Sequence, residues 1–255
     1  MAHQLQASRF ELKYIISEAC ARAVKNYSLS YLEPDEHTDP NEGWGYSVHS
    51  LYLDSLDLKT MKATLQGEKN RFKLRLRFYE DTPDAPVFFE IKRRVNQVIL
   101  KQRAAVYRSS VPRILAGHWP SRSDLIKDND ANHKALHNFC SLQKKIDARP
   151  AAYTSYLREA YWTPESDNLR VTFDRRILGG EFRERLSVAN LENWAEPKVD
   201  GVVLELKFTD RFPDWMRAMV QTYSLKRTSM PKYVDCVQAI RTRNRKQDVA
   251  ARYFS

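Results

Sequence analysis

RFKLRLRF, at residues 71–78, alternates basic and apolar side chains from end to end. A period of two predicts a β-strand, because neighbouring side chains of a strand point to opposite faces. One face of this strand is apolar, and the other carries Arg71, Lys73, Arg75 and Arg77. Four like charges in a row repel one another, so we expect either a solvated surface or a face against which something strongly anionic binds.

Seven further segments have the composition and pattern of strands. They are RFELKYII (9–16), SVHSLYLDS (47–55), VFFEIKRR (87–94), VILKQRAAVY (98–107), YTSYLREAYW (153–162), LRVTFDRRIL (169–178) and VVLELKF (202–208). The strand at 71–78 and the two that follow it are joined by short turns, which predicts an antiparallel meander.

Helices are predicted between the strands and at the end of the chain. Ser17 is suited to cap a helix that follows the first strand, and Gly67 is suited to end another. The helix that Gly67 ends is predicted at 56–66, and the remaining helical segments lie within 110–148, at 212–225 and at about 233–254.

Two segments between the predicted helices and strands are expected to be a loop and a turn. Residues 33–45 are polar and predict a loop, and Gly179-Gly180 predicts a hairpin turn into EFRERLSV. The chain has no internal repeat and no linker-like composition, so we expect a single domain over residues 1–255 that ends in the helix at about 233–254.

The composition favours an anionic partner. Lys and Arg number 42 against 32 Asp and Glu, which gives a net charge of +10. The three cysteines have no CxxC spacing, so neither a zinc cluster nor a disulfide framework is expected, and a reducing cytoplasm is the natural location. No apolar leader or run of about 20 apolar residues is present, so we expect no signal peptide and no membrane span.

The polar faces of the strands repeat a carboxylate and an amine two residues apart. Glu-x-Lys occurs at Glu11/Lys13, Glu90/Lys92 and Glu205/Lys207. A sheet with one solvated face of mixed charge accounts for any single strand. A closed antiparallel barrel accounts for the whole set, because its outer face packs on helices while every second residue lines its interior.

Such an interior suits a polyanion. Arginine and lysine side chains from several strands would converge on phosphate oxygens. The carboxylates could hold Mg²⁺ or Mn²⁺, ions that take few protein ligands and share phosphate oxygens. We therefore expect a closed antiparallel eight-stranded β-barrel with flanking α-helices, in the α+β class.

The order of these strand motifs resembles that of a known family. The order RFELKY, SLYLDS, KLRLRFYE, FFEIKRR, LKQR, YLREAY, LRVTFDRR, LELKF and PKYV is similar to the polyphosphate polymerase domain of the vacuolar transporter chaperone (VTC) complex. That domain is one of the triphosphate tunnel metalloenzymes. The resemblance spans about residues 8–240 and implies transfer of the γ-phosphate of ATP to a growing polyphosphate chain with a divalent metal, Mn²⁺ or Mg²⁺.

The resemblance also implies roles for individual residues. The phosphate-binding set is Lys13, Lys73, Arg75, Arg77, Lys92, Lys101, Arg103, Tyr156, Arg158, Arg170, Lys207 and Lys232. The catalytic set is Lys73, Arg75, Arg77, Lys101, Arg158, Arg170 and Glu205. Glu205 would be the metal ligand, with Glu11, Glu90 and Asp174 as further candidates. From the residues alone, Asp174 could equally pair with a neighbouring arginine.

One position departs from the family pattern. Family members often carry Ser directly before the last lysine, where this chain has Pro231 in SMPKY. That change removes one hydroxyl contact unless Ser229 supplies it.

Four functions stay open at this stage. The first is a polyphosphate polymerase that uses ATP or another nucleoside triphosphate. The second is a triphosphate or polyphosphate hydrolase on the same fold, and the third is a non-catalytic module that binds polyphosphate or nucleotides. The fourth is nucleic-acid binding, which the net charge and the segment RTRNRKQ (241–247) suggest. No nucleic-acid-binding motif accompanies this segment, so we do not expect a nucleic acid as partner. A membrane protein partner is a further possibility that the family suggests.

Overall fold

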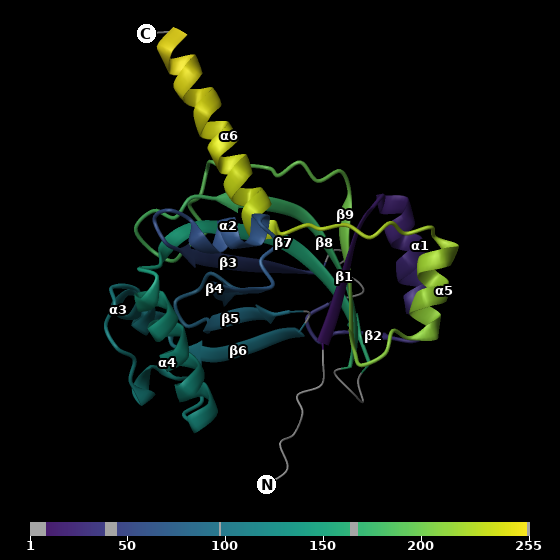
Figure 1. Ribbon diagram of the computed structural model, residues 1–255, viewed down its shortest axis with the longest axis horizontal. Coiled ribbons are helices and arrows are strands. Elements are labelled where there is room, and N and C mark those ends of the chain that lie inside the picture. Colours follow the sequence, from purple (N-terminus) through teal and green to yellow (C-terminus); the bar gives the residue numbers. More distant parts are fainter. Residues whose placement is uncertain (1–8, 39–44, 97, 164–167, 254–255) are drawn as a thin grey trace. The chain divides into compact units, whose positions relative to one another are not determined.

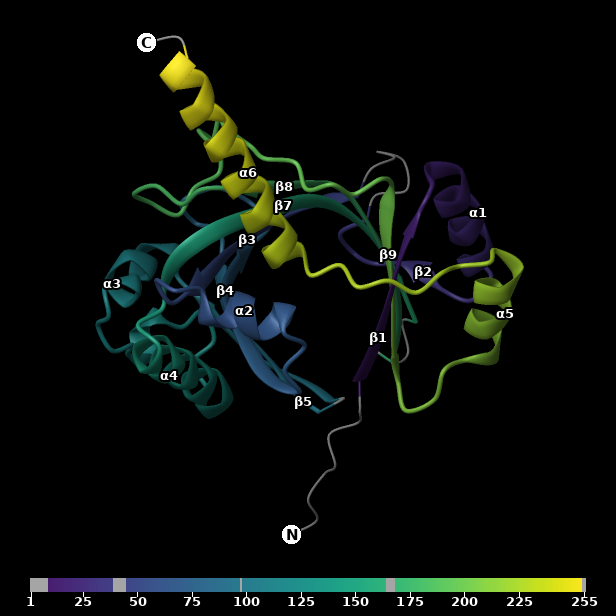
Figure 2. The same ribbon diagram turned by 45° about the horizontal axis from the view of Figure 1, so that its top comes forward.

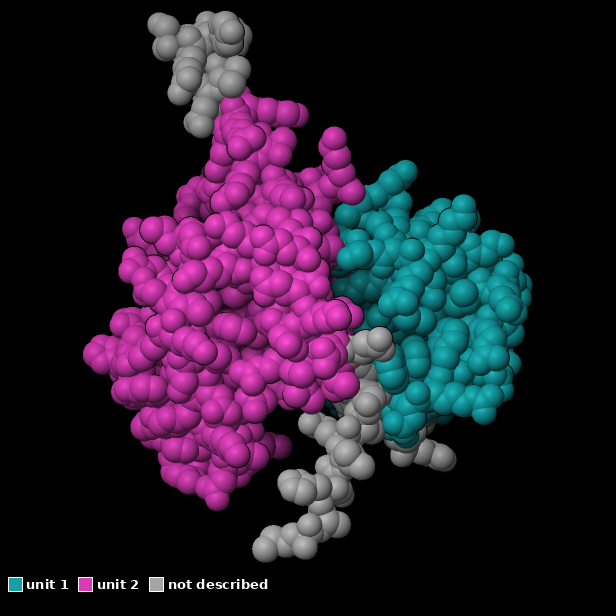
Figure 3. All heavy atoms as spheres, viewed as in Figure 1, with its two compact units in different colours: residues 1–46, 157–176, 199–230 teal, residues 47–156, 177–198, 231–255 magenta. Residues whose placement is uncertain are grey.

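The computed structural model describes residues 9–38, 45–96, 98–163 and 168–253. The protein has a mixed α+β fold, with a nine-stranded sheet and helices (Figures 1 and 2). Its contacts divide it into two compact units, coloured in Figure 3. Unit 1 comprises residues 1–46, 157–176 and 199–230, and unit 2 comprises residues 47–156, 177–198 and 231–255.

Unit 2 is built on the predicted antiparallel meander. Its strands β3 (Tyr46–Asp54), β4 (Asn70–Phe78), β5 (Val87–Val95) and β6 (Val98–Val106) pair in this order, each antiparallel to the next. Directly opposite residues share one face of the sheet. Leu74 lies opposite Ile91, and Leu76 lies opposite Phe89, so the apolar halves of these strands form one continuous face.

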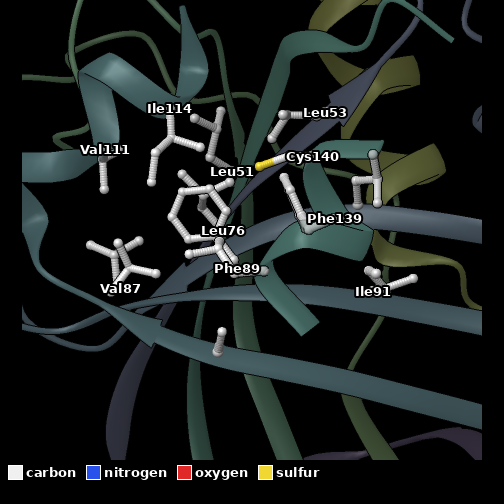
Figure 4. Close-up of a cluster of buried hydrophobic side chains, with 14 of the residues drawn as sticks. Leu51, Leu53, Leu76, Val87, Phe89, Ile91, Val111, Ile114, Phe139 and Cys140 are labelled. Atoms are coloured by element: carbon white, nitrogen blue, oxygen red, sulfur yellow. The ribbon is translucent and has the colours of Figure 1, made fainter. Parts of the chain in front are cut away.

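Helices α3 (Val111–Leu115) and α4 (Asp130–Lys145) cover this apolar face. Figure 4 shows the resulting core, in which Phe89 of β5 meets Phe139 of α4 edge to face, with ring centroids 4.9 Å apart. Leu74, Leu76 and Phe78 are fully buried in it. Burial of the apolar half of RFKLRLRF fixes the register, so its basic half must lie on the opposite face.

The predicted helical region at 110–148 is mostly helix with an irregular middle. Short 3₁₀ turns at Arg108–Ser110 (η1) and Arg122–Asp124 (η2) accompany α3 and α4. A capping box between Ser121 and Asp124 begins the second turn, and the side chain of Asn129 caps α4.

Helices α2 (Lys59–Leu65) and α6 (Lys232–Tyr253) meet at the base of α6. Asp54 accepts hydrogen bonds from the backbone and hydroxyl of Thr60 and, at 2.8 Å, from the hydroxyl of Tyr233. Tyr233, Val237 and Ile240 are buried there, whereas the C-terminal turns of α6 extend beyond the body of unit 2 (Figures 1 and 2).

The hairpin predicted at Gly179-Gly180 is wrong. Both glycines are the last residues of strand β8 (Leu169–Gly180), and a loop follows. Their small size serves packing instead: a Cβ on Gly179 would lie 2.9 Å from the Cβ of Cys236, and one on Gly180 would lie 2.9 Å from the ring of Trp194.

Unit 1 contains strand β1 (Arg9–Ile16), which pairs antiparallel with β9 (Val202–Thr209), and β9 pairs antiparallel with β8. Its core receives apolar side chains from helices α1 (Glu18–Ser28) and α5 (Asp214–Thr222), which are side by side in Figures 1 and 2. Ser17 caps α1 as predicted. A short strand β2 (Glu33–Pro34), which pairs with β7 (Arg149–Trp162), lies in the segment predicted as a loop.

Hydrogen bonds join the strands in the order β1-β9-β8-β7-β3-β4-β5-β6. Among the described residues no such bonds join β1 to β6, so the pairing confirms a large antiparallel sheet but not the predicted closed barrel. Within the same residues, no helix is both long enough and apolar enough to cross a membrane. The division into two units leaves the single domain over 1–255 a prediction.

The three cysteines carry free thiols. Cys140 and Cys236 are buried and Cys20 is half-buried. Burial raises the pKa of all three, to about 11 for Cys140 and about 12 for Cys236.

Candidate functional site

In unit 2, the face of the sheet opposite α3 and α4 carries rows of basic residues. Lys73, Lys92 and Lys101 lie directly opposite one another on β4, β5 and β6. The neighbouring row is Arg75, Glu90 and Arg103. We call this surface, completed by Arg77, Tyr52, Tyr156 and Lys232, the unit 2 polar face.

Glu90 is the centre of the unit 2 polar face. Its carboxylate is only 1 % exposed and accepts the Nε of Arg75 at 2.7 Å. The ammonium of Lys101 lies 2.8 Å from Glu90 Oε1, and Arg103 Nε lies 3.4 Å from the same oxygen. Burial alone would raise the pKa of Glu90, but Arg75, Arg77 and Lys101 hold it well below its usual range. Glu90 is therefore an anion at neutral pH and holds the cations in place.

Positive charge nevertheless exceeds negative charge on this face. Strands β4, β5 and β6 contain one acidic residue, Glu90, among their many basic residues. The Lys101 side chain is 43 % exposed, but desolvation of its ammonium by the surrounding protein, together with the charges of Arg75 and Arg103, outweighs the attraction of Glu90 and lowers its pKa to about 7. An anion bound beside Lys101 would favour its charged form.

Two tyrosine hydroxyls accept hydrogen bonds from the arginines. Arg77 Nη2 donates to the Oη of Tyr156 at 3.0 Å, and Arg75 Nη1 donates to the Oη of Tyr52 at 3.2 Å. Although burial raises the pKa of Tyr52, the charges of Arg75, Lys73 and Arg77 lower it to about 8. Tyr52 was missed by the sequence analysis, where its only signal was its place on the polar side of SVHSLYLDS.

The base of α6 contributes to the same face. Lys232, the first residue of α6, is 8 % exposed and its Nζ lies 5.0 Å from the ring centroid of Tyr156. The next residue, Tyr233, stacks on Tyr52 with ring centroids 4.7 Å apart. The start of α6 is therefore fixed against two side chains of the unit 2 polar face.

In unit 1, the face opposite α1 and α5 places Glu205 among three cations. On β9, Glu205 lies opposite Lys13 of β1. Its carboxylate oxygens lie 3.3 Å from Lys13 Nζ, 2.9 Å from Lys207 Nζ and 3.5 Å from Arg158 Nη2. Glu11 lies 3.2 Å from the same Lys13 ammonium. We call these residues, with Arg170, Asp174 and Thr172 of β8, the unit 1 polar face.

Two lysines respond differently to this environment. Burial acts to lower the pKa of Lys13, but the carboxylates of Glu205 and Glu11 act to raise it by a larger amount, so the pKa is raised overall. For Lys207, burial outweighs the attraction of Glu205, and Arg158 adds to the effect, so its pKa falls to about 8.

Asp174 pairs with an arginine, which was one of the two possibilities for this residue. Arg158 Nε and Nη2 donate to its two oxygens at 2.7 and 2.8 Å, and Asp174 is fully buried. Arg170 donates to Asp35 at 2.5 Å and to the hydroxyl of Tyr46 at 3.2 Å. Asp35 was missed because it lies in the segment predicted as a polar loop.

Every predicted site residue thus lies on one of the two polar faces. The unit 2 polar face includes Lys73, Arg75, Arg77, Glu90, Lys92, Lys101, Arg103, Tyr156 and Lys232. The unit 1 polar face includes Glu11, Lys13, Arg158, Arg170, Asp174, Glu205 and Lys207. The roles of these residues remain predictions.

The carboxylates differ in their fitness to hold a metal ion. Among the described residues no three His, Cys, Asp or Glu side chains cluster as a complete ligand set. Glu90 and Asp174 are each held by an arginine through two contacts. Glu11 and Glu205 instead contact lysine ammonium groups on flexible stems, and the arginine Arg158 reaches Glu205 only through one longer contact of 3.5 Å. This pair therefore suits an ion such as Mg²⁺ or Mn²⁺ that takes few protein ligands.

A family model described as the VTC domain matches residues 8–241. None of the curated proteins compared with the chain matches it. Among solved structures, a Bacillus halodurans protein provisionally named as an adenylate cyclase is 13% identical, with a TM-score of 0.46 over 88% of this chain and 95% of that chain. The PH1819 protein of Pyrococcus horikoshii OT3 is 11% identical, with a TM-score of 0.46 over 90% of this chain and 98% of that chain.

Proposed function

Because the chain belongs to the VTC domain family, we propose that it is a metal-dependent phosphotransferase that extends inorganic polyphosphate with the γ-phosphate of ATP. The observation that supports this most is the charge of the two polar faces, where basic side chains are held by buried carboxylates. Neither an ordinary solvated surface nor a packed core requires charges arranged in this way.

The unit 2 polar face would bind the phosphate chain. Arg75 and Arg77 are oriented by Glu90 and Tyr156, so their guanidinium groups are ordered before a ligand arrives. Preordered donors lose little entropy on binding and stabilise charge on phosphate oxygens. Lys73, Lys92 and Lys101 supply a row of further positive charge beside them.

The unit 1 polar face would hold the metal ion through Glu205, with Glu11 as a second ligand. A bound Mg²⁺ or Mn²⁺ would neutralise phosphate oxygens during transfer. Arg158 and Lys207 already contact Glu205, so they are placed to orient a phosphate next to that carboxylate.

Little covalent chemistry is left for the side chains in such a reaction. The terminal phosphate of a polyphosphate chain is already an anionic nucleophile, so no general base is needed. The protein's tasks are to align the two phosphates and to neutralise their charge. The closed eight-stranded tunnel, the use of ATP or another nucleoside triphosphate, a cytoplasmic location and a membrane protein partner are further parts of this proposal.

The deciding experiment incubates the pure protein with ATP and Mn²⁺, and follows polyphosphate and orthophosphate together. Growth of a polymer at the expense of ATP supports the polymerase. Release of orthophosphate without polymer would assign the hydrolase. Salt-sensitive binding of tripolyphosphate with no turnover in Mn²⁺ or Mg²⁺ would assign a binding module.

A further inference from the structure

Thr172 is a buried side chain of the unit 1 polar face that the sequence analysis did not assign to the site. It lies on β8, directly opposite Glu205 of β9. Its neighbours along the strand, Val171 and Phe173, belong to the apolar core with α1 and α5. Because side chains alternate along a strand, Thr172 points to the opposite side, where Glu205 lies.

Among the residues that the structure describes, the hydroxyl of Thr172 has no hydrogen-bond partner. The residue is 0 % exposed and its Oγ1 is buried and unpaired. Buried hydroxyls are normally paired, because an unpaired one loses its water contacts without replacement. Thr38 of the same unit shows the usual case: its hydroxyl donates to Asp35 at 2.8 Å and accepts the backbone N–H of Ala160 at 3.1 Å.

Cations that could contact a phosphate lie near Thr172 on the unit 1 polar face. In the adjacent row of the same face, Arg170 lies opposite Lys207. The Nη2 of Arg158 lies 3.5 Å from a carboxylate oxygen of Glu205. A hydroxyl can donate one hydrogen bond, and a phosphate oxygen held by these cations is an acceptor of matching charge.

We propose that Thr172 is a further phosphate-binding residue, whose hydroxyl donates a hydrogen bond to a phosphate oxygen that Arg170 and Lys207 neutralise. This inference rests on the proposed function of the same face. The unpaired hydroxyl is then a group that the fold keeps for the ligand at a cost to its own stability.

The test compares Thr172→Val, which removes the hydroxyl at nearly constant shape, with Thr172→Ser, which keeps it. Calorimetric titration with inorganic tripolyphosphate, without metal, measures binding apart from turnover. We expect about tenfold weaker binding for Thr172→Val, the loss of one hydrogen bond to a charged group. Binding by Thr172→Ser should stay within about twofold of the unchanged protein.

Thermal unfolding without ligand supplies the second readout. Removing an unpaired buried hydroxyl should raise the Tm of Thr172→Val by about 2–4 °C. Thr38→Val, in which a paired hydroxyl is lost, should unfold at a lower temperature than the unchanged protein.

Two results would overturn the inference while the proposed function stands. One is equal tripolyphosphate affinity in Thr172→Val and the unchanged protein. The other is a lower Tm, or failure to fold, in Thr172→Val, because the hydroxyl would then have a structural partner such as a bound water. If the unchanged protein itself binds no tripolyphosphate, the proposed function falls together with the inference.

Discussion

The two polar faces share a central glutamate but differ in charge balance. In unit 2, Glu90 is the one acidic residue in the sequence of β4, β5 and β6. In unit 1, carboxylates and cations alternate: Glu11 and Glu205 share Lys13, and Asp174 pairs with Arg158. The unit 2 polar face therefore has surplus positive charge, whereas the unit 1 polar face is close to balanced.

This difference suggests a division of tasks. Surplus positive charge attracts a phosphate chain, which supplies the missing negative charge. A balanced face with carboxylates suits a metal ion, because the ion brings its own positive charge and needs anionic oxygen ligands. Four substitutions test whether the two glutamates and their cations have these separate roles.

The largest effect is expected from Glu205→Gln. If Glu205 holds the metal, turnover of ATP with Mn²⁺ should fall at least about 100-fold, because a metal's charge stabilisation is lost. Binding of tripolyphosphate without metal should persist or strengthen, since a negative charge is removed. Glu36→Gln, a change at an exposed carboxylate of the same unit, is the control and should retain activity. Unchanged turnover in Glu205→Gln would refute the metal role.

The next effect is expected from Arg75→Ala. Tripolyphosphate binding should weaken about 10- to 100-fold, because a charge-assisted contact is removed. The fold should remain, because Lys101 and Arg103 still neutralise Glu90. Isothermal titration measures the affinity, and circular dichroism checks the fold. Arg93→Ala removes an exposed arginine from the other face of the same sheet, opposite Phe72, and should bind within about twofold of the unchanged protein. Normal binding by Arg75→Ala would disconnect this face from phosphate.

Glu90→Gln should act on stability more than on chemistry. Loss of the buried carboxylate leaves Arg75, Lys101 and Arg103 to repel one another, which we expect to cost about 3 kcal/mol and to lower the Tm by about 6–10 °C. Tripolyphosphate should raise the Tm of this variant more than that of the unchanged protein. Differential scanning calorimetry measures both.

The pH dependence of Glu90→Gln is a further check. The pKa of Glu90 is depressed in the folded protein, so its stabilisation is present above the unfolded pKa of about 4.3 and is lost as the pH falls through the folded pKa. The variant should lose part of this acid dependence. If Glu90→Gln instead abolished turnover and left the Tm unchanged, Glu90 would have the catalytic role that we assign to Glu205 and not a structural one.

The smallest effect is expected from Lys101→Met. With a pKa of about 7 in the empty protein, Lys101 loses its proton as the pH rises from about 6 to 8, which should weaken tripolyphosphate binding severalfold. The variant should bind more weakly at pH 6 and lack this decline. The stability of the folded protein changes with pH in the opposite direction to the binding. Above about pH 7 the folded Lys101 has lost its proton, whereas the lysine of the unfolded chain keeps its proton up to about pH 10.4, so the free energy of unfolding increases as the pH rises from about 7. Parallel pH profiles for the two proteins would contradict this role.

The sequence predicted the strands of both polar faces because alternation is a local signal. RFKLRLRF in β4 and LRVTFDRRIL in β8 show it directly, since burial of one half of each strand commits the other half to the opposite face. The same signal placed Arg75 and Glu90 on one face before their pairing was known.

The sequence could not predict contacts that depend on distant segments. Asp35 meets Arg170 across 135 residues, and Tyr52 meets Tyr233 across 181 positions of the chain. A tyrosine or aspartate in isolation has no periodicity to indicate such partners. The hairpin predicted at Gly179-Gly180 was wrong for a related reason. Two glycines are compatible both with a tight turn and with close packing, and the packing against Cys236, which is distant in sequence, is visible only in the structure.

The buried thiols have a practical consequence for the chemistry of the chain. Only a thiolate reacts readily with alkylating reagents, and the raised pKa values keep Cys20, Cys140 and Cys236 protonated at neutral pH. A cysteine introduced at Leu56, which is 94% exposed, would therefore react far faster than the native three. The protein can carry a single fluorescent or spin label without first losing its own cysteines.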